Sequence, residues 1–370
     1  MHFLRPTSRR TRVDAAGRQR TGALRPVVRA GIGLLLASGL LTASASPASA
    51  VAPSVIVVPG ASGHVYVTNQ LDDTVSVIDA RTNKVVATVP VGSAPEGVTV
   101  APDGRHVYIA DNGSAQVSVL DTRTNKIVCT VPVGKSPSGV DLSPDGRFLY
   151  VANGGSNSVS VLDTRTNRVA ASVPVGTSPV SVAVSPDGAA AYVANAGSGS
   201  VSVIDTRTHR AVRDLPAGRS PVGVAVTPDG GSAYIADEVA ASVSVVEVRT
   251  GTVTATVPVG DGPFDVALGP DGRSAYVAVL GPGNVSVIDT RSRRISATVS
   301  VGSPGTDPFN VAVSPNAIYV TEQGAGTLTV IDPKTLEIVA TVTVGSSPYG
   351  VAASPQRLSI ISPSASRPRA

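Results

Sequence analysis

The chain has 370 residues, of which 42% are apolar, and its 30 Lys and Arg outnumber its 26 Asp and Glu, for a formal net charge of +4. This apolar fraction is too high for a disordered chain, and a single cysteine excludes a scaffold of disulfides within the chain. Four histidines, one methionine and no tryptophan leave little to ligate haem or copper and no indole on which a cofactor could stack.

The first 50 residues have the composition of an export signal. Residues 1–29 carry eight arginines and one acid, and the apolar run 30–43 is followed by Ala48-Ser49-Ala50. This order predicts a secretory signal peptide over residues 1–50, cleaved after Ala50, with the Sec and twin-arginine routes both open. The run of 14 residues is shorter than the roughly 20 needed to span a bilayer, so no transmembrane anchor is expected. We expect a secreted, extracellular protein, with association with the cell wall left open.

Removal of this signal changes the sign of the net charge. After Ala50 the chain has 22 Lys and Arg against 25 Asp and Glu, a net charge of −3. Because binding to nucleic acid relies on a basic surface, no nucleic acid partner is expected.

A unit of about 42 residues repeats along the rest of the chain. Seven tyrosines mark it, five spacings being 42 residues and the last 43: Tyr66, Tyr108, Tyr150, Tyr192, Tyr234, Tyr276 and Tyr319. Each unit has four short runs rich in Val and Ile between turn residues, as in 97–100, 106–109, 117–121 and 126–131. Four strands per repeat are typical of a propeller blade. The sequence therefore predicts an all-β fold: a seven-bladed β-propeller over residues 51–360, with four antiparallel strands per blade, and a disordered tail over 361–370.

Short motifs within the unit carry a family resemblance. The first unit contains Tyr66-Val67-Thr68-Asn69, and Tyr150-Val151-Ala152-Asn153 is a variant of it. With Ser143-Pro144-Asp145-Gly146, these motifs make the chain similar to the YVTN-family β-propeller repeat proteins. The resemblance implies the fold and a kinship with surface-layer propellers and, more remotely, with lactonase-type and redox propellers. It implies no activity, because function lies in sites added to such a scaffold.

The repeats have a candidate innermost strand at each end, although the ring has room for only one of the two. Residues 53–58 and 348–353 both align with the first strand of the second unit, residues 95–100. Seven blades need seven innermost strands, and the sequence offers eight. Which end supplies the innermost strand of the first blade therefore stays open.

Residues that recur in every unit are interpreted as structural. Asp79 and its equivalents precede a turn, where their carboxylates are expected to accept backbone N–H bonds. The seven tyrosines lie among apolar neighbours and are expected to pack between blades. Function is instead expected where the repeat is broken.

The loops that join the second strand to the third, and one blade to the next, are expected to share one face. That face would be acidic, with few basic residues (Lys135 and Arg219) against ten acids: Asp72, Asp73, Glu96, Asp111, Asp237, Glu238, Asp261, Asp265, Asp307 and Glu322. Such a face would attract cations or basic surfaces. Alternatively, these acids serve only solubility.

Aromatic residues break the repeat at three consecutive blade junctions. Phe264, Phe309 and Tyr349 each follow the proline that opens a blade, where the earlier units have Glu96, Ser138, Val180 and Val222. The middle junction is also longer, with 45 residues from Pro263 to Pro308. Phe264-Asp265, Phe309-Asn310 and Tyr349-Gly350 are therefore predicted to form a binding surface near the channel mouth. The alternative is that the rings only plug the channel or support the joint.

Asp141 is a further departure, because the equivalent residue of every other unit is Thr or Ala. A carboxylate within an innermost strand is costly unless it faces the wet channel or a cation. Asp141, with Glu96 and Asp265, is predicted to line the channel and contact a cation or polar ligand.

Two functions follow from this pattern. The first is a secreted, non-catalytic binding scaffold, expected to be a monomer, that binds a protein, glycan or small molecule through the acidic, aromatic-rimmed face. It is favoured because no nucleophile, base and orienting residue stand out together. The alternative is a lactonase-like hydrolase or lyase with a divalent cation held by Glu96, Asp141 and Asp265, with Asp307 in reserve. No cofactor is otherwise expected.

Overall fold

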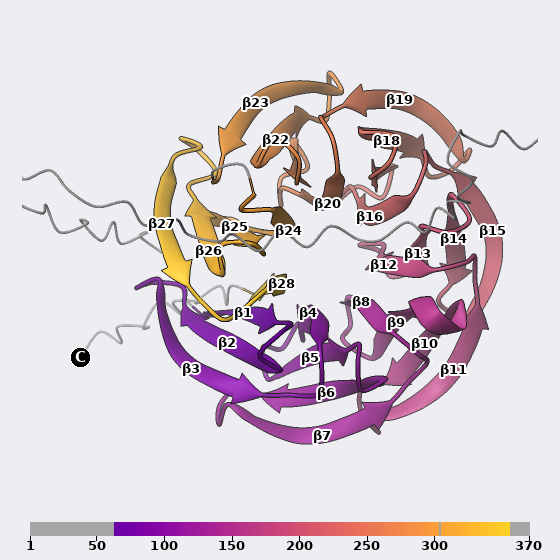
Figure 1. The fold of residues 1–370 in the computed structure, drawn as a ribbon. Coiled ribbons are helices and arrows are strands. Elements are labelled where there is room, and N and C mark those ends of the chain that lie inside the picture. The colour runs from indigo at the N-terminus through magenta and orange to yellow at the C-terminus, as the bar shows by residue number, and fades with distance from the viewer. Residues whose placement is uncertain (1–62, 303–304, 356–370) are drawn as a thin grey trace, which may run out of the picture. The chain divides into compact units, whose positions relative to one another are not determined.

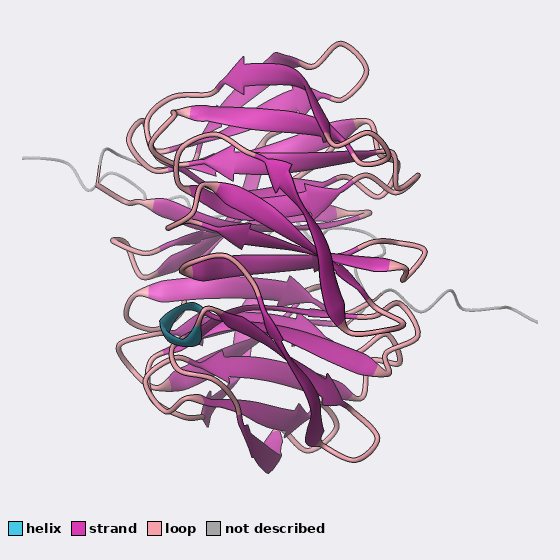
Figure 2. Cartoon of the chain, turned by 90° about the vertical axis from the view of Figure 1, so that its right-hand side faces the viewer, coloured by secondary structure: helices cyan, strands magenta, loops and turns pink. Residues whose placement is uncertain are grey.

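In a computed structural model of the chain, residues 63–302 and 305–355 are described. The predicted signal peptide (1–50), the N-terminal strand candidate (53–58) and the predicted tail (361–370) lie outside these residues. Within them, seven four-stranded sheets surround a central channel (Figure 1). Figure 2 shows the same sheets from the side, with the short 3-10 helix η1 (Gly154–Ser156) on one edge. The predicted all-β, seven-bladed propeller with four antiparallel strands per blade is confirmed.

Blades 2 to 7 each take four consecutive strands. Blade 2 has β4 (Pro95–Val100), β5 (His106–Asp111), β6 (Gln116–Asp121) and β7 (Lys126–Pro132). Blade 3 has β8 (Pro137–Leu142), β9 (Phe148–Asn153), β10 (Ser158–Asp163) and β11 (Arg168–Pro174). Blade 4 has β12 (Pro179–Val184), β13 (Ala190–Asn195), β14 (Ser200–Asp205) and β15 (Arg210–Pro216).

The remaining blades follow the same order. Blade 5 has β16 (Pro221–Val226), β17 (Ser232–Asp237), β18 (Ser242–Glu247) and β19 (Thr252–Pro258). Blade 6 has β20 (Pro263–Leu268), β21 (Ser274–Val279), β22 (Asn284–Asp289) and β23 (Arg294–Ser300). Blade 7 has β24 (Pro308–Ser314), β25 (Ala317–Glu322), β26 (Thr327–Ile331) and β27 (Ile338–Thr343).

Blade 1 is built from both ends of the described chain. It combines β1 (His64–Asn69), β2 (Thr74–Asp79) and β3 (Lys84–Pro90) with the C-terminal β28 (Pro348–Ala353). Strand β28 runs antiparallel to β1, with Tyr66 opposite Ala352 and Val67 opposite Val351. The C-terminal segment therefore supplies the innermost strand of blade 1, which the sequence left open.

The ring is closed through its innermost strands. Strands β28, β4, β8, β12, β16, β20 and β24 contact one another in this cyclic order around the channel (Figure 1). Thr68 of the YVTN motif joins blades 1 and 2 at the closure, since its hydroxyl donates to the Glu96 carbonyl (2.6 Å) and accepts from the Gly350 N–H (2.8 Å). Thr321 does the same between blades 7 and 1, donating to the Tyr349 carbonyl at 2.8 Å.

The core consists of layers between adjacent blades. The seven repeat tyrosines are at most 5% exposed, and Tyr192 of blade 4 packs in one cluster with Val224 and Ile235 of blade 5. Asp79 accepts the N–H groups of Arg81 (2.9 Å) and Thr82 (2.8 Å), which caps the turn after its strand. Both structural interpretations of the recurring residues are confirmed. No helix within 63–302 and 305–355 has the length and apolar character needed to cross a membrane.

Candidate functional site: a capped cavity in the channel

One side chain from each blade contributes to a layer at one end of the channel. Each follows the proline that opens an innermost strand, and together they form what we call the channel cap: Glu96, Ser138, Val180, Val222, Phe264, Phe309 and Tyr349. Val180, Val222 and Phe264 belong to one apolar cluster. Hydrogen bonding of Glu96 with Ser138 and Tyr349 continues the layer on the opposite side. The cap therefore draws its residues from all seven blades.

The three aromatic rings pack against each other within this cap. The Phe264 and Phe309 ring centroids lie 3.7 Å apart, and those of Phe309 and Tyr349 lie 4.5 Å apart. Phe309 is only 8% exposed, whereas Phe264 and Tyr349 are half-buried. The rings thus form a packed layer in which Phe264 and Tyr349 keep part of their surface exposed and line the cavity described below. Burial and the neighbouring Glu96 raise the pKa of Tyr349, so its hydroxyl stays protonated at neutral pH.

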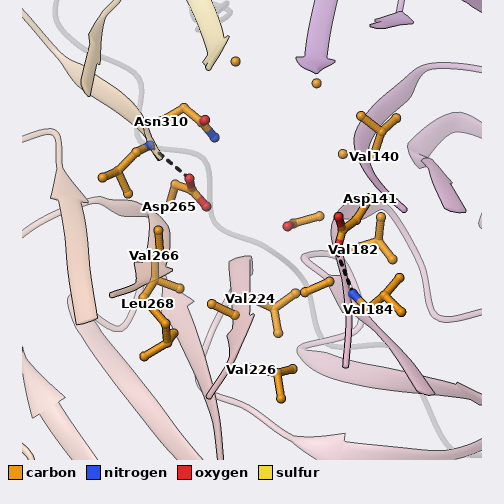
Figure 3. Close-up of a pocket in the computed structure, with 18 of the residues that line it drawn as sticks. Val140, Asp141, Val182, Val184, Val224, Val226, Asp265, Val266, Leu268 and Asn310 are labelled. Atoms are coloured by element: carbon orange, nitrogen blue, oxygen red, sulfur yellow. Dashed lines mark hydrogen bonds between the residues drawn. The ribbon is translucent and has the colours of Figure 1, made fainter. Parts of the chain in front are cut away.

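A cavity of about 480 Å³ lies in the channel against the cap. Phe264 and Tyr349 line one end of it, and Pro186, Pro228 and Pro270 line the other. Its walls are mainly valines of the innermost strands: Val98, Val140, Val182, Val184, Val224, Val226, Val266 and Val311. Figure 3 labels six of them, from Val140 to Val266. A largely apolar cavity with a few polar groups is the usual form of a small-molecule site.

Asp141 faces this cavity from blade 3. Its carboxylate accepts the N–H of Leu142 (2.8 Å) and that of Val184 in blade 4 (2.8 Å; Figure 3). An innermost strand has a free edge toward the channel, and a side-chain acceptor can satisfy its N–H groups there. Burial in the channel raises the pKa of Asp141 to about 6, and these hydrogen bonds offset only part of that effect.

Asp265 makes the corresponding link between blades 6 and 7. Its Oδ2 accepts the N–H of Val311 at 3.1 Å (Figure 3), and burial raises its pKa to about 6 as well. One blade further, Asn310 occupies the same repeat position, and its Oδ1 accepts the N–H of Val351 at 3.1 Å. The same link is therefore made once by a carboxylate and once by a neutral amide.

The other predicted site acids lie elsewhere. Glu96 belongs to the cap, where Gln70 donates to it at 3.1 Å and burial raises its pKa. Asp307 lies with Asp72 in a separate open groove between blades 7 and 1. Across residues 63–302 and 305–355, no three His, Cys, Asp or Glu side chains are grouped so that they could hold a metal ion. The structure thus does not bring Glu96, Asp141, Asp265 and Asp307 together as the divalent-cation alternative required.

Part of the predicted acidic face is wrong. Asp111 and Asp237 are fully buried and Glu322 is 3% exposed, so these three acids contribute no surface charge. They occupy the fourth position of the YVTN motif, where Asn69 stands in blade 1. Asp237 accepts the Gly218 N–H (2.9 Å) and the Ser244 hydroxyl (2.5 Å), as part of the blade itself.

Asp237→Asn is expected to stabilise the protein at pH 7.5 by about 1 kcal/mol. Burial raises the pKa of Asp237, so its ionised form is disfavoured in the folded state. Asn69 shows that an amide fits this position, since it accepts the Gly345 N–H at 3.0 Å and donates to Ser76 at 3.0 Å. Urea unfolding measures the effect.

The matched control for this substitution is Asp237→Ala. It leaves the Gly218 N–H and the Ser244 hydroxyl without their partner and should cost about 1–3 kcal/mol. An Asn variant as unstable as the Ala variant would show that the charge itself is needed.

Comparison with known proteins gives a family and several structural neighbours. The family model described as YNCE-like beta-propeller matches residues 44–144 and 141–232. No curated protein matches the chain. Among solved structures, Kuenenia stuttgartiensis hydrazine synthase is 26% identical, with a TM-score of 0.66 over 71% of this chain and 90% of that chain.

Two further structures share the fold at 18% identity. A functionally unknown protein from Desulfotomaculum acetoxidans has a TM-score of 0.70 and covers 80% of this chain and 100% of its own. Dihydro-heme d1 dehydrogenase NirN, in complex with DHE, has a TM-score of 0.61 over 78% of this chain and 75% of its own. At this identity the likeness concerns the fold alone.

Proposed function

We propose that this chain, which belongs to the YNCE-like beta-propeller family, is a secreted, non-catalytic binding protein that takes a small molecule into the channel cavity. The observation that carries this proposal is the cavity of about 480 Å³, which has an aromatic end and mainly apolar walls. Pockets of this size and character suit small ligands better than they suit a protein surface.

The residues around the cavity favour binding over catalysis. Ser138, Ser181 and Tyr349 carry the hydroxyl groups among the described residues that line it, and no His, Cys or Lys is among them. Ser138 hydrogen-bonds with Glu96 in the cap, but the described lining holds no His or Lys that would complete the nucleophile, base and orienting residue of a catalytic serine. The carboxylates of Asp141 and Asp265 accept hydrogen bonds from backbone N–H groups of the next blade, at 2.8 and 3.1 Å. These bonds link neighbouring innermost strands in the cavity wall.

The proposed location rests on the N-terminal 50 residues. Their arginines, apolar run and Ala48-Ser49-Ala50 support export, with the mature chain starting at Val51. Sequencing the N-terminus of the protein recovered from the culture medium tests this part of the proposal. Retention of the full-length chain inside the cell would contradict it.

A thermal-shift panel on the purified chain tests the binding function. The panel contains lactones, glycans, alkylamines, Ca²⁺ and Mg²⁺, and a ligand of the folded state raises the melting temperature. For any member that binds, the double variant Phe264→Ala/Phe309→Ala is expected to lose at least tenfold in affinity, because it removes two rings of the cap.

Phe148→Ala is the matched control for the aromatic variants. Phe148 packs on His209 with ring centroids 4.8 Å apart, away from the residues that line the cavity. Its removal should leave ligand affinity unchanged. A panel in which no member raises the melting temperature, or a ligand that binds the cap variant as tightly as the wild type, would contradict the proposed function.

A further inference from the structure

The two carboxylates of the cavity stand on opposite walls. Asp141 belongs to blade 3 and Asp265 to blade 6, and Figure 3 shows them on the two sides of the cavity. Neither has a basic partner, since the described residues that line the cavity include no Lys or Arg. Two negative charges therefore face one largely apolar space without a countercharge from the protein.

These charges exceed what the fold requires. Asn310 makes the same link to the next blade as Asp265 does, at the same distance of 3.1 Å, without any charge. At the position of Asp141, the other blades have Thr99 or alanine: Ala183, Ala225, Ala267, Ala312 and Ala352. A buried charge without a countercharge lowers the stability of the folded state. Two such carboxylates in one cavity are therefore consistent with a cationic ligand that neutralises them.

The rest of the lining narrows the chemistry of this ligand. Phe264 and Tyr349 line the same cavity as Asp265. Burial is the main cause of the raised pKa of the Tyr349 hydroxyl, and the charge of Asp265 is close enough to contribute to it. Aromatic faces beside a carboxylate attract organic ammonium groups through cation–π and ionic contacts. The valine walls suit a hydrocarbon body, whereas a strongly hydrated metal ion would need several converging oxygen ligands.

We propose that the cavity binds a small alkylammonium compound, with one ammonium group between Asp265, Phe264 and Tyr349, and a second, where the ligand has one, at Asp141. This inference rests on the proposed function and names the ligand class of the same site. Ligands with two ammonium groups are then favoured, because both carboxylates are paired in a single complex.

Isothermal titration calorimetry at pH 7.5 on the purified chain tests the inference. The probes are α,ω-diaminoalkanes of three to eight carbons, the monoamines of equal length and the corresponding diols. The best diamine is expected to bind at least tenfold more tightly than its monoamine, and the diols should show no binding. Diols that bind as tightly as diamines, or the absence of binding by every amine, would overturn the proposal.

Single substitutions locate the two ends of the ligand. Asp265→Asn keeps the link to Val311 in the form that Asn310 uses, and it should reduce the diamine to the affinity of the monoamine. Asp141→Asn should do the same, and Asp141→Ala, which copies the residue of five other blades, replaces it if the amide variant does not fold. Diamine affinity unchanged in the folded variants at both positions would refute the site.

Two further measurements separate this inference from the proposed function. Asp187→Asn, at an exposed turn outside the described cavity lining, is the charge control and should leave diamine binding unchanged. If no amine binds but a lactone or glycan does so in a cap-dependent way, the ligand class is wrong and the binding function stands. If no panel member binds, both fail.

Discussion

Removal of residues 348–370 is expected to abolish the cooperative unfolding transition of the chain. The truncation deletes β28, which pairs with β1 through Val65–Ala353, Tyr66–Ala352 and Val67–Val351. It also removes Gly350, whose N–H donates to Thr68 across 282 positions of sequence. The lost strand pairing and burial amount to roughly 5 kcal/mol or more, comparable to the whole stability of an ordinary domain.

Urea unfolding followed by far-UV circular dichroism measures this effect. Removal of residues 356–370 alone keeps β28 and should leave the transition in place. A full transition in the longer truncation would contradict the expected result. In that case, urea unfolding of a chain that lacks both residues 51–62 and residues 348–370 would show whether the N-terminal strand candidate at 53–58 takes the place of β28.

The second large effect concerns pH. Between pH 7.5 and 4.5, the wild-type chain is expected to gain stability relative to the double variant Asp141→Asn/Asp265→Asn. The pKa of each carboxyl is about 6 in the folded protein, against an ordinary value of 3.8. The folded chain thus binds more protons than the unfolded chain between these values, and the free energy of unfolding rises as the pH falls through 6 toward 4. The gain is at most about 3 kcal/mol per carboxyl.

The comparison with the double variant isolates these two groups. Glu96, Asp111 and Asp237 also have raised pKa values, but they are present in both proteins and their contributions cancel. The pKa of Asp187 is instead lowered, because Ser185 donates a hydrogen bond to its carboxylate. Ionised Asp187 therefore stabilises the folded state at neutral pH, and this stabilisation is lost only as the pH falls below the ordinary range of a carboxyl group. Urea unfolding at half-unit pH steps provides the measurement. Parallel curves for the wild type and the double variant would refute the assignment.

The fold could be predicted almost completely from the sequence, because one spacing recurs in every blade. The tyrosines lie on the second strand of each sheet, and the strand runs around them alternate as a blade requires. The closure could not be predicted, because residues 53–58 and 348–353 both fit the innermost-strand pattern. Only the pairing of β28 with β1 distinguishes them.

The site was predicted only in part. Asp141 and Asp265 could be singled out, since each replaces a small or neutral residue of the repeat. Their links to Val184 and Val311 span 43 and 46 positions, and a sequence does not say which backbone groups of the next blade remain unpaired.

The buried acids illustrate a second limit. Asp111 and Asp237 are the last residues of their strands and are fully buried. If the strand is predicted to end one residue earlier, each of them is assigned to the exposed loop and counted as a surface charge. The signal that could have placed them is Asn69, Asn153 and Asn195 at the same repeat position. A buried polar residue that recurs there indicates a structural hydrogen bond.

The composite blade also sets the order of assembly. Blades 2 to 7 each draw on one continuous stretch, so each can form while the ribosome is still adding residues downstream. Blade 1 has to wait for its C-terminal strand, and the contact that completes it has the longest sequence separation in the toroid. In a chain that folds during synthesis, ring closure is therefore expected to come last, and until then β1 lacks the neighbouring strand that β28 supplies.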